Sequence, residues 1–307
     1  MGTSWSVRLQ AARSLDLHAL HAAIQDRLGR IVAEMSTWRE DSCISAYNRA
    51  SAGTWLDIPV DFHAVLACAL RVAAASDGAF DPSIGPMVRA WGFGAHASGR
   101  DLPGRGALEA ARSSVGWHRI RLREEPRQVL QPGNLELDLS AIAKGRGVDV
   151  VVALLRSRGI PAALVEVGGE LHGYGRKADA TPWFVLVEAG PEEADHALPP
   201  RVLALDGMAI ATSGDRWHHY ERGGRRYTHT IDPRSGEPVP HAPTAVTVLA
   251  DDAMHADAWA TALAVLGQEA GLVLAERIGL PARYLWRGQD GTMQERMSSA
   301  FEGRLAA

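Results

Sequence analysis

Two stretches, Asp138-Leu139-Ser140-Ala141-Ile142-Ala143-Lys144-Gly145 and Val165-Glu166-Val167-Gly168-Gly169-Glu170, decide how the middle of this chain folds. The first opens an amphipathic run that predicts a helix over residues 143–158, closed by Gly159. The second ends a predicted strand over residues 163–167 on a pair of glycines. Because glycine alone lets another group approach the backbone without steric cost, this helix–strand unit indicates a ligand site.

The composition is that of an ordinary globular protein. The chain has 307 residues, 46% hydrophobic and 22% charged, which is enough for a large core or two fused lobes. A formal net charge of -4 without a long basic run argues against a nucleic-acid partner. The 12 histidines lack zinc-ligand spacing, and two cysteines, Cys43 and Cys68, make no disulfide framework.

No stretch approaches the roughly 18 apolar residues of a membrane span, so none is expected. Residues 1–9 contain no charged region followed by an apolar one, and therefore no secretory signal. Read literally, the sequence predicts a cytoplasmic protein. A leader upstream of residue 1 would instead make it periplasmic.

Helical and strand periodicities alternate along the chain and predict an α+β fold of mixed sheets with packed helices. No repeat or Pro/Ser linker divides it, so we expect residues 1–307 to form a single catalytic unit with two lobes. A Gly-, Pro- and Trp-rich segment over residues 81–106 is predicted to be a long loop, functional or disordered, and by its residues alone an ordinary surface loop is the more common explanation. Other predicted helices cover residues 16–35, 60–75, 253–266 and 270–278; other strands cover residues 5–9, 183–188, 244–250 and 282–286, with a hairpin turn at 221–226.

Asp257 and Thr261 are a candidate metal-binding pair. Residues four apart on a helix share a face, and Mg²⁺ prefers such oxygen ligands. By spacing alone, a capping or solvated pair is the more common explanation. The neighbouring residues are small or apolar, however, which predicts a buried helix, and a buried carboxylate needs a partner or a metal.

His229 is a candidate general base, because histidine is the residue that most often takes protons near neutral pH. A locally hydrogen-bonded edge histidine is the plainer alternative. Trp38 offers a flat face suited to stacking on a purine, although a partly buried core tryptophan fits equally well. Residues 211–215 are predicted to form a small-residue turn whose N–H groups could meet an anion, although an ordinary surface loop is the more common explanation. Neither the P-loop nor the dinucleotide-binding fingerprint is present.

Taken in order, these segments resemble the ApbE family, the FAD:protein FMN transferases. The resemblance runs from residue 1 to about residue 286, and it rests on several ordered motifs: residues 1–3, 35–39, 78–82, 91–94, 138–145, 167–170, 211–215, 229–236 and 256–261. It implies a two-lobed, T-fold-related architecture.

The resemblance also implies an activity. Family members bind FAD, use Mg²⁺ at the pyrophosphate, transfer FMN to a threonine or serine of an acceptor flavoprotein and release AMP. By this resemblance Asp257, Thr261 and main-chain oxygens near Ala141 and Ala260 would hold Mg²⁺, and His229 would be the catalytic base. Trp38 stands where the family usually has tyrosine, which keeps stacking and loses the phenol hydrogen bond. Other positions matching FAD contacts are Met1, Ala79, Phe80, Asp81, Asp138, Lys144 and Ile231.

Two alternatives stay open from the sequence. An Mg²⁺-dependent FAD pyrophosphatase would use the same site with water as the acceptor. A non-catalytic FAD-binding protein would not need Asp257, Thr261 or His229.

Overall fold

The computed structural model describes residues 2–95, 97, 102–187, 198–199, 201–214, 219–240, 245–288, 290 and 292–305. Its contacts divide the chain into two compact units. Unit 1 contains residues 29–143 and 215–242, and unit 2 contains residues 2–28, 144–214 and 243–307.

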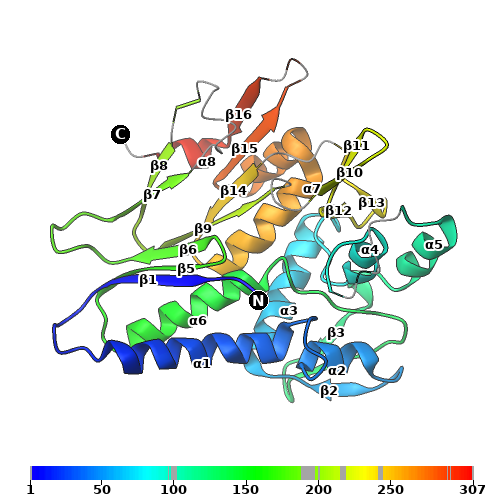
Figure 1. Cartoon of the computed structure of the whole chain (residues 1–307), viewed down its shortest axis with the longest axis horizontal. Helices are drawn as coiled ribbons and strands as arrows, with labels where there is room; N and C mark the ends of the chain where they lie inside the picture. Colours follow the sequence, from blue (N-terminus) through cyan, green and yellow to red (C-terminus); the bar gives the residue numbers. More distant parts are fainter. Residues whose placement is uncertain are drawn as a thin grey trace. The chain divides into compact units, whose positions relative to one another are not determined.

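Unit 2 is built on a seven-stranded sheet (Figure 1). Every neighbouring pair of its strands is antiparallel. In sheet order the strands are β1 (Trp5–Gln10), β5 (Ala162–Val167), β6 (Glu170–Tyr174), β9 (Met208–Ser213), β14 (Ala245–Ala250), β15 (Ala282–Arg287) and β16 (Met293–Met297).

Helix α7 (Ala253–Ile278) packs along β9 and β14 and buries one apolar layer of unit 2 (Figure 1). A second apolar cluster joins the sheet to the hairpin β7 (Trp183–Val187)–β8 (Arg201–Leu205) and to α8 (Ser299–Glu302). Its fully buried members include Leu203, Leu205 and Phe301. The sheet is therefore a firm platform for the turns at its strand ends.

Gly267 interrupts α7 with φ 76° and ψ 174°, a conformation that glycine adopts without strain. The predicted helices over residues 253–266 and 270–278 are thus confirmed as two segments meeting at this glycine. Within the described residues, α7 is also the one helix that is long and apolar enough to cross a membrane by length and composition. A core helix passes the same test, and 56% of that stretch of α7 is buried.

Unit 1 is mainly helical. Its small sheets are β2 (Trp55–Asp57)–β4 (Gln128–Leu130)–β3 (Arg121–Arg123), the hairpin β10 (His219–Arg222)–β11 (Arg225–Thr228) and the pair β12 (Ile231–Asp232)–β13 (Glu237–Pro238). Its helices are α2 (Cys43–Arg49), α3 (Val60–Ala75), α4 (Gly85–Ala90), α5 (Arg105–Ser113) and the 3₁₀ turn η1 (Trp117–Arg119). Helix α1 (Leu17–Met35) begins in unit 2 and ends in unit 1, and α6 (Ala143–Ser157) begins at the border at residues 143–144.

Two sequence predictions are wrong. Residues 81–106 are not one long loop, because they contain α4 and the start of α5. The apolar side chains of this segment pack against the hairpin β10–β11 and order it. Residues 211–213 are not a turn but the end of β9, a central strand, where the Thr212 hydroxyl lies 2.9 Å from that of Thr247. Asp215, Thr244 and Glu188 lie outside the described residues.

Candidate functional site

In unit 2, Lys144 joins two buried carboxylates. Its Nζ lies 2.5 Å from Oε1 of Glu170 and 3.3 Å from Oδ1 of Asp257. Glu170 is 2% exposed and Asp257 is 4% exposed. Lys144 comes from the first turn of α6, Glu170 from the start of β6 and Asp257 from the first turns of α7. The fold therefore brings three titratable side chains from distant sequence positions into contact with one another.

Their charges depend on one another. Burial alone would lower the pKa of Lys144, but the carboxylates of Asp257 and Glu170 outweigh burial and raise it above its usual value. Burial raises the pKa of Glu170, and the Asp257 carboxylate adds to this, while Lys144 opposes both. Lys144 is therefore an ammonium that bridges the two carboxyl groups.

The N-termini of α6 and α7 bind each other's carboxylates. The Gly145 N–H donates to Oδ2 of Asp257 at 3.0 Å. In return, the N–H groups of Ala253 and Met254 donate to the Asp149 carboxylate at 2.8 and 3.1 Å. Burial raises the pKa of Asp149 to about 7, although these two donors favour its ionised form. Each carboxylate satisfies helix N–H groups that have no partner within their own helix.

Gly145 makes this crossing possible. A Cβ at this position would lie 2.1 Å from the carbonyl oxygen of Ala253. The β5–β6 turn also needs its paired glycines, because Gly168 and Gly169 have φ of 62° and 100°. A Cβ on Gly168 would lie 3.2 Å from Cδ of Lys144. The stem of Lys144 thus passes over the glycine turn to reach Glu170.

The donors in unit 2 fit a hard divalent cation. Asp257 offers a carboxylate, and Thr261 offers a hydroxyl one turn further along α7. Oε2 of Glu170 is a buried acceptor without a hydrogen-bond partner in the described part of the chain. Oxygen ligands such as the Asp257 carboxylate and the Thr261 hydroxyl are what Mg²⁺ prefers. Within the described residues no three His, Cys, Asp or Glu side chains group as a metal site, so such a cation would also need hydroxyl, main-chain, water or substrate oxygens.

A second group of predicted residues meets in unit 1. Asp81 is 7% exposed, and its carboxylate accepts from the N–H and hydroxyl of Ser83 at 2.8 and 2.6 Å and from the N–H of Trp117 at 3.1 Å. Burial raises the pKa of Asp81, against these donors. The next residue, Pro82, accepts from the Asp138 N–H at 2.7 Å. The predicted contact segments around Asp81 and Asp138 are therefore neighbours.

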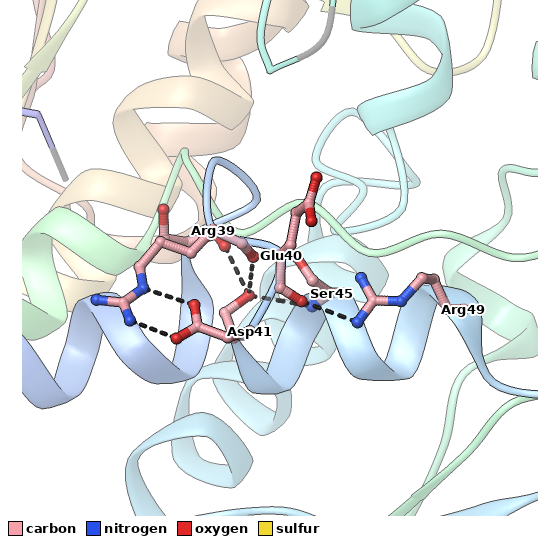
Figure 2. Close-up of polar contacts among 7 residues, drawn as sticks. Arg39, Glu40, Asp41, Ser45 and Arg49 are labelled. Atoms are coloured by element: carbon pink, nitrogen blue, oxygen red, sulfur yellow. Dashed lines mark hydrogen bonds and ion pairs between the residues drawn. The ribbon is translucent and has the colours of Figure 1, made fainter.

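Asp138 lines a cleft of about 160 Å³ in unit 1. The other lining residues are Thr37, Glu40, Ser45, Asn48, Arg49, Arg89, Ala95 and Glu136. Figure 2 shows how one wall is tied together: Arg49 donates to the main chain of Glu40 at 2.8 Å, and the Ser45 hydroxyl donates to the main chain of Arg39 at 2.7 Å. The wall is therefore fixed before any ligand arrives.

Trp38 follows Thr37 of this cleft and is 68% exposed, so it is not a core tryptophan. Ala79 and Phe80 are buried at 1% and 3%, which leaves mainly their backbone for a ligand. Met1 lies outside the described residues.

His229 directly follows β11 and meets the edge of the Phe93 ring, with ring centroids 6.3 Å apart. Phe93 belongs to an aromatic cluster in which Trp91 donates its indole N–H to the carbonyl of Gly236 at 2.8 Å. Ile231 is 4% exposed within the same cluster. The aromatic segment thus supports strand β11, which His229 directly follows.

The family model described as "ApbE family" matches residues 1–284. The chain belongs to the ApbE family.

Curated ApbE relatives cover nearly the whole chain. A protein of Vibrio cholerae named FAD:protein FMN transferase is 34% identical over 307 residues, covering 100% of this chain and 91% of the relative. One of Haemophilus influenzae with the same name is 34% identical and covers 98% and 88%.

Solved ApbE structures share the fold. The apo form of the Pseudomonas stutzeri flavinyl transferase ApbE superposes with a TM-score of 0.91 at 35% identity, covering 100% of this chain and 95% of that one. The Vibrio cholerae flavin transferase ApbE gives 0.90 at 34% identity, covering 99% and 96%. The expected α+β, ApbE-like fold is therefore confirmed.

Among the predicted site residues, the structure brings Lys144 and Asp257 together in unit 2, with Ala260 and Thr261 on the same helix. Ala141 lies in the turn that precedes α6. Their roles stay predictions. Sequence reasoning missed Glu170, although it belongs to a quoted motif. The composition draws attention to Lys144 alone, because only two of the 32 basic residues are lysine, Lys144 and Lys177. A lysine in an arginine-rich chain suggests a need for a compact ammonium.

Proposed function

We propose that this protein transfers the FMN moiety of FAD to a threonine or serine hydroxyl of an acceptor flavoprotein and releases AMP, with Mg²⁺ as the required cation. In this proposal residues 1–307 act as one catalytic unit. Membership of a family whose curated members are named FAD:protein FMN transferase supports the reaction class. The observation that carries the proposal is the buried Asp257 carboxylate, held at the α6 N-terminus beside Lys144.

Asp257 and Thr261 would hold Mg²⁺, together with main-chain oxygens near Ala141 and Ala260. When bound, the cation would neutralise charge on the diphosphate of FAD. The hydrogen bond from Gly145 fixes the orientation of the Asp257 carboxylate, so that little reorganisation is needed when the cation binds.

The FAD-contacting residues support binding in different ways. Trp38 presents an exposed ring for the adenine, and Asp138 lines the polar cleft in unit 1. Ala79, Phe80, Asp81 and Ile231 are held by buried contacts, and they would offer backbone groups at fixed positions. Rigid placement of this kind favours a single bound orientation of the substrate.

His229 would take the proton from the attacking hydroxyl. Its place directly after β11, beside the aromatic cluster, fixes the histidine through packing. A positioned base typically contributes about 10²- to 10⁴-fold to such a step.

The test is an incubation of the protein with FAD, Mg²⁺ and an acceptor protein carrying a threonine/serine flavinylation motif. We expect intact-mass analysis to show FMN covalently attached to the acceptor, and chromatography to show an equal amount of AMP. Free FMN and AMP without the adduct would replace this proposal with an FAD pyrophosphatase. FAD that stays bound and unchanged would indicate a binding protein. An acceptor whose target hydroxyl is removed serves as the matched control.

A further inference from the structure

Glu170 is placed unusually for a carboxylate without an assigned role. It is 2% exposed, and its Oε1 lies 2.5 Å from Nζ of Lys144. Its Oε2 is buried and has no hydrogen-bond partner in the described part of the chain. A buried, half-satisfied carboxylate is costly to the fold, so its position calls for a reason other than stability.

The distances from the Lys144 ammonium show which of its two partners, Glu170 or Asp257, it contacts more closely. The ammonium lies 0.8 Å closer to Glu170 than to Asp257, from 2.5 and 3.3 Å. Without Glu170, one lysine and one aspartate would form a neutral ion pair. With it, the ammonium has a second and closer partner, and it is drawn away from the Asp257 oxygen that a cation would bind.

We propose that Glu170 is a positioning residue, which holds the Lys144 ammonium off Asp257 so that Asp257 can bind the divalent cation. This inference rests on the proposed function, because it takes Asp257 as a metal ligand. It assigns Glu170 an effect that acts through Lys144 rather than through direct contact with the metal. When the cation binds Asp257, Lys144 gives up its longer contact and stays paired with Glu170.

The test is a double-mutant cycle on cation affinity, measured with Mn²⁺ by the electron paramagnetic resonance signal of the free ion. The variants are Glu170→Gln, Lys144→Met and the double variant. Glu170→Gln keeps the side-chain shape and replaces the carboxyl group by an amide, so it leaves Asp257 as the main partner of Lys144. We expect Mn²⁺ affinity to fall about 10- to 100-fold, the usual effect of losing a residue that orients a ligand.

Lys144→Met removes the competing ammonium, and we expect it to bind Mn²⁺ at least as tightly as the unsubstituted protein. In that background Glu170→Gln should lower affinity less than about threefold, because no ammonium is left to position. A loss of Mn²⁺ affinity of equal size in both backgrounds would overturn the inference. It would show that Glu170 binds the cation directly or acts only through its charge. Failure of the unsubstituted protein to bind Mn²⁺ would overturn it as well.

Two controls complete the experiment. Asp257→Asn tests the metal site itself: if it leaves Mn²⁺ affinity unchanged, the metal assignment in the proposed function fails. If it abolishes binding while the cycle shows no coupling, only the role of Glu170 fails. Circular dichroism checks folding. Should Glu170→Gln not fold, Glu170→Asp replaces it, since the shorter side chain keeps the charge but releases the ammonium. We then expect an intermediate loss of affinity that disappears with Lys144→Met, and persistence there would refute the proposal.

Discussion

Gly145→Ala should destabilise the protein, although adding one methyl group at an open position of a helix normally stabilises it. The new methyl group would lie 2.1 Å from the carbonyl oxygen of Ala253, 2.5 Å from its carbonyl carbon and 2.7 Å from Cα of Met254. All three are backbone atoms of α7, so no side-chain rotation can relieve the contact. The two helices must separate, and this weakens the hydrogen bond from Gly145 to Asp257.

The magnitude follows from three contributions. Overpacking costs typically 1–3 kcal/mol, and losing a hydrogen bond to a carboxylate costs about 1.5–3 kcal/mol. Alanine regains about 1 kcal/mol of helix propensity over glycine. The net loss is about 3 kcal/mol, which corresponds to a fall of about 5 °C in the thermal midpoint of a chain of this length.

Gly29→Ala is the matched control. Gly29 lies within α1, and a Cβ there would meet nothing within 4 Å. The same substitution should therefore stabilise the protein by about 0.5–1 kcal/mol. Differential scanning fluorimetry of both variants measures the two changes in thermal midpoint, which should have opposite signs. If Gly145→Ala melts at or above the unsubstituted protein, the close helix crossing inferred from the structure is wrong.

Three further outcomes are expected. Thr261→Val should raise the Mg²⁺ concentration needed for half-maximal flavinylation about tenfold, because it removes a ligand and keeps the shape; an unchanged requirement would exclude the hydroxyl from the metal site. His229→Ala should lower the rate of FMN transfer about 10²- to 10⁴-fold while FAD binding, followed by flavin fluorescence, stays within about twofold; parallel losses would show a binding role. Burial, reinforced by Arg156, lowers the pKa of His172 to about 4. The unfolded chain then binds more protons below pH of about 6.5, so His172 should cost the fold about 3 kcal/mol of stability as pH falls from 6.5 to 4. His172→Leu should lose less stability over this window in urea titrations, and equal slopes would contradict the shift.

Much of the helical framework could be predicted from the sequence. The apolar spacing over residues 16–35 and 60–75 matches α1 and α3 closely, and Pro59 and Gly159 mark helix boundaries as expected. Local signals suffice for such elements, because periodicity and capping are encoded within a few turns. The predicted hairpin turn at residues 221–226 is likewise confirmed, with both Gly223 and Gly224 at positive φ.

The elements and contacts that the sequence does not predict depend on residues far apart in the chain. The stretch Ala211-Thr212-Ser213 has the small residues of a turn. It is extended because it pairs with the neighbouring strand β14. Helix α4 begins with Gly85 and Pro86, which conceal it in a glycine- and proline-rich segment. Glu170 and Asp257 lie 26 and 113 residues from Lys144, so no local pattern could show that they meet.

The mutual binding of the two helix starts has a consequence for how the protein is made. Residue 257 leaves the ribosome 113 residues after Lys144. At about 5–20 residues per second, that is a delay of roughly 6 to 23 seconds. During this interval the emerging α6 has neither its carboxylate partner nor the partner for its own Asp149. During synthesis, α6 therefore keeps its first turn without the Asp257 contacts until α7 has emerged.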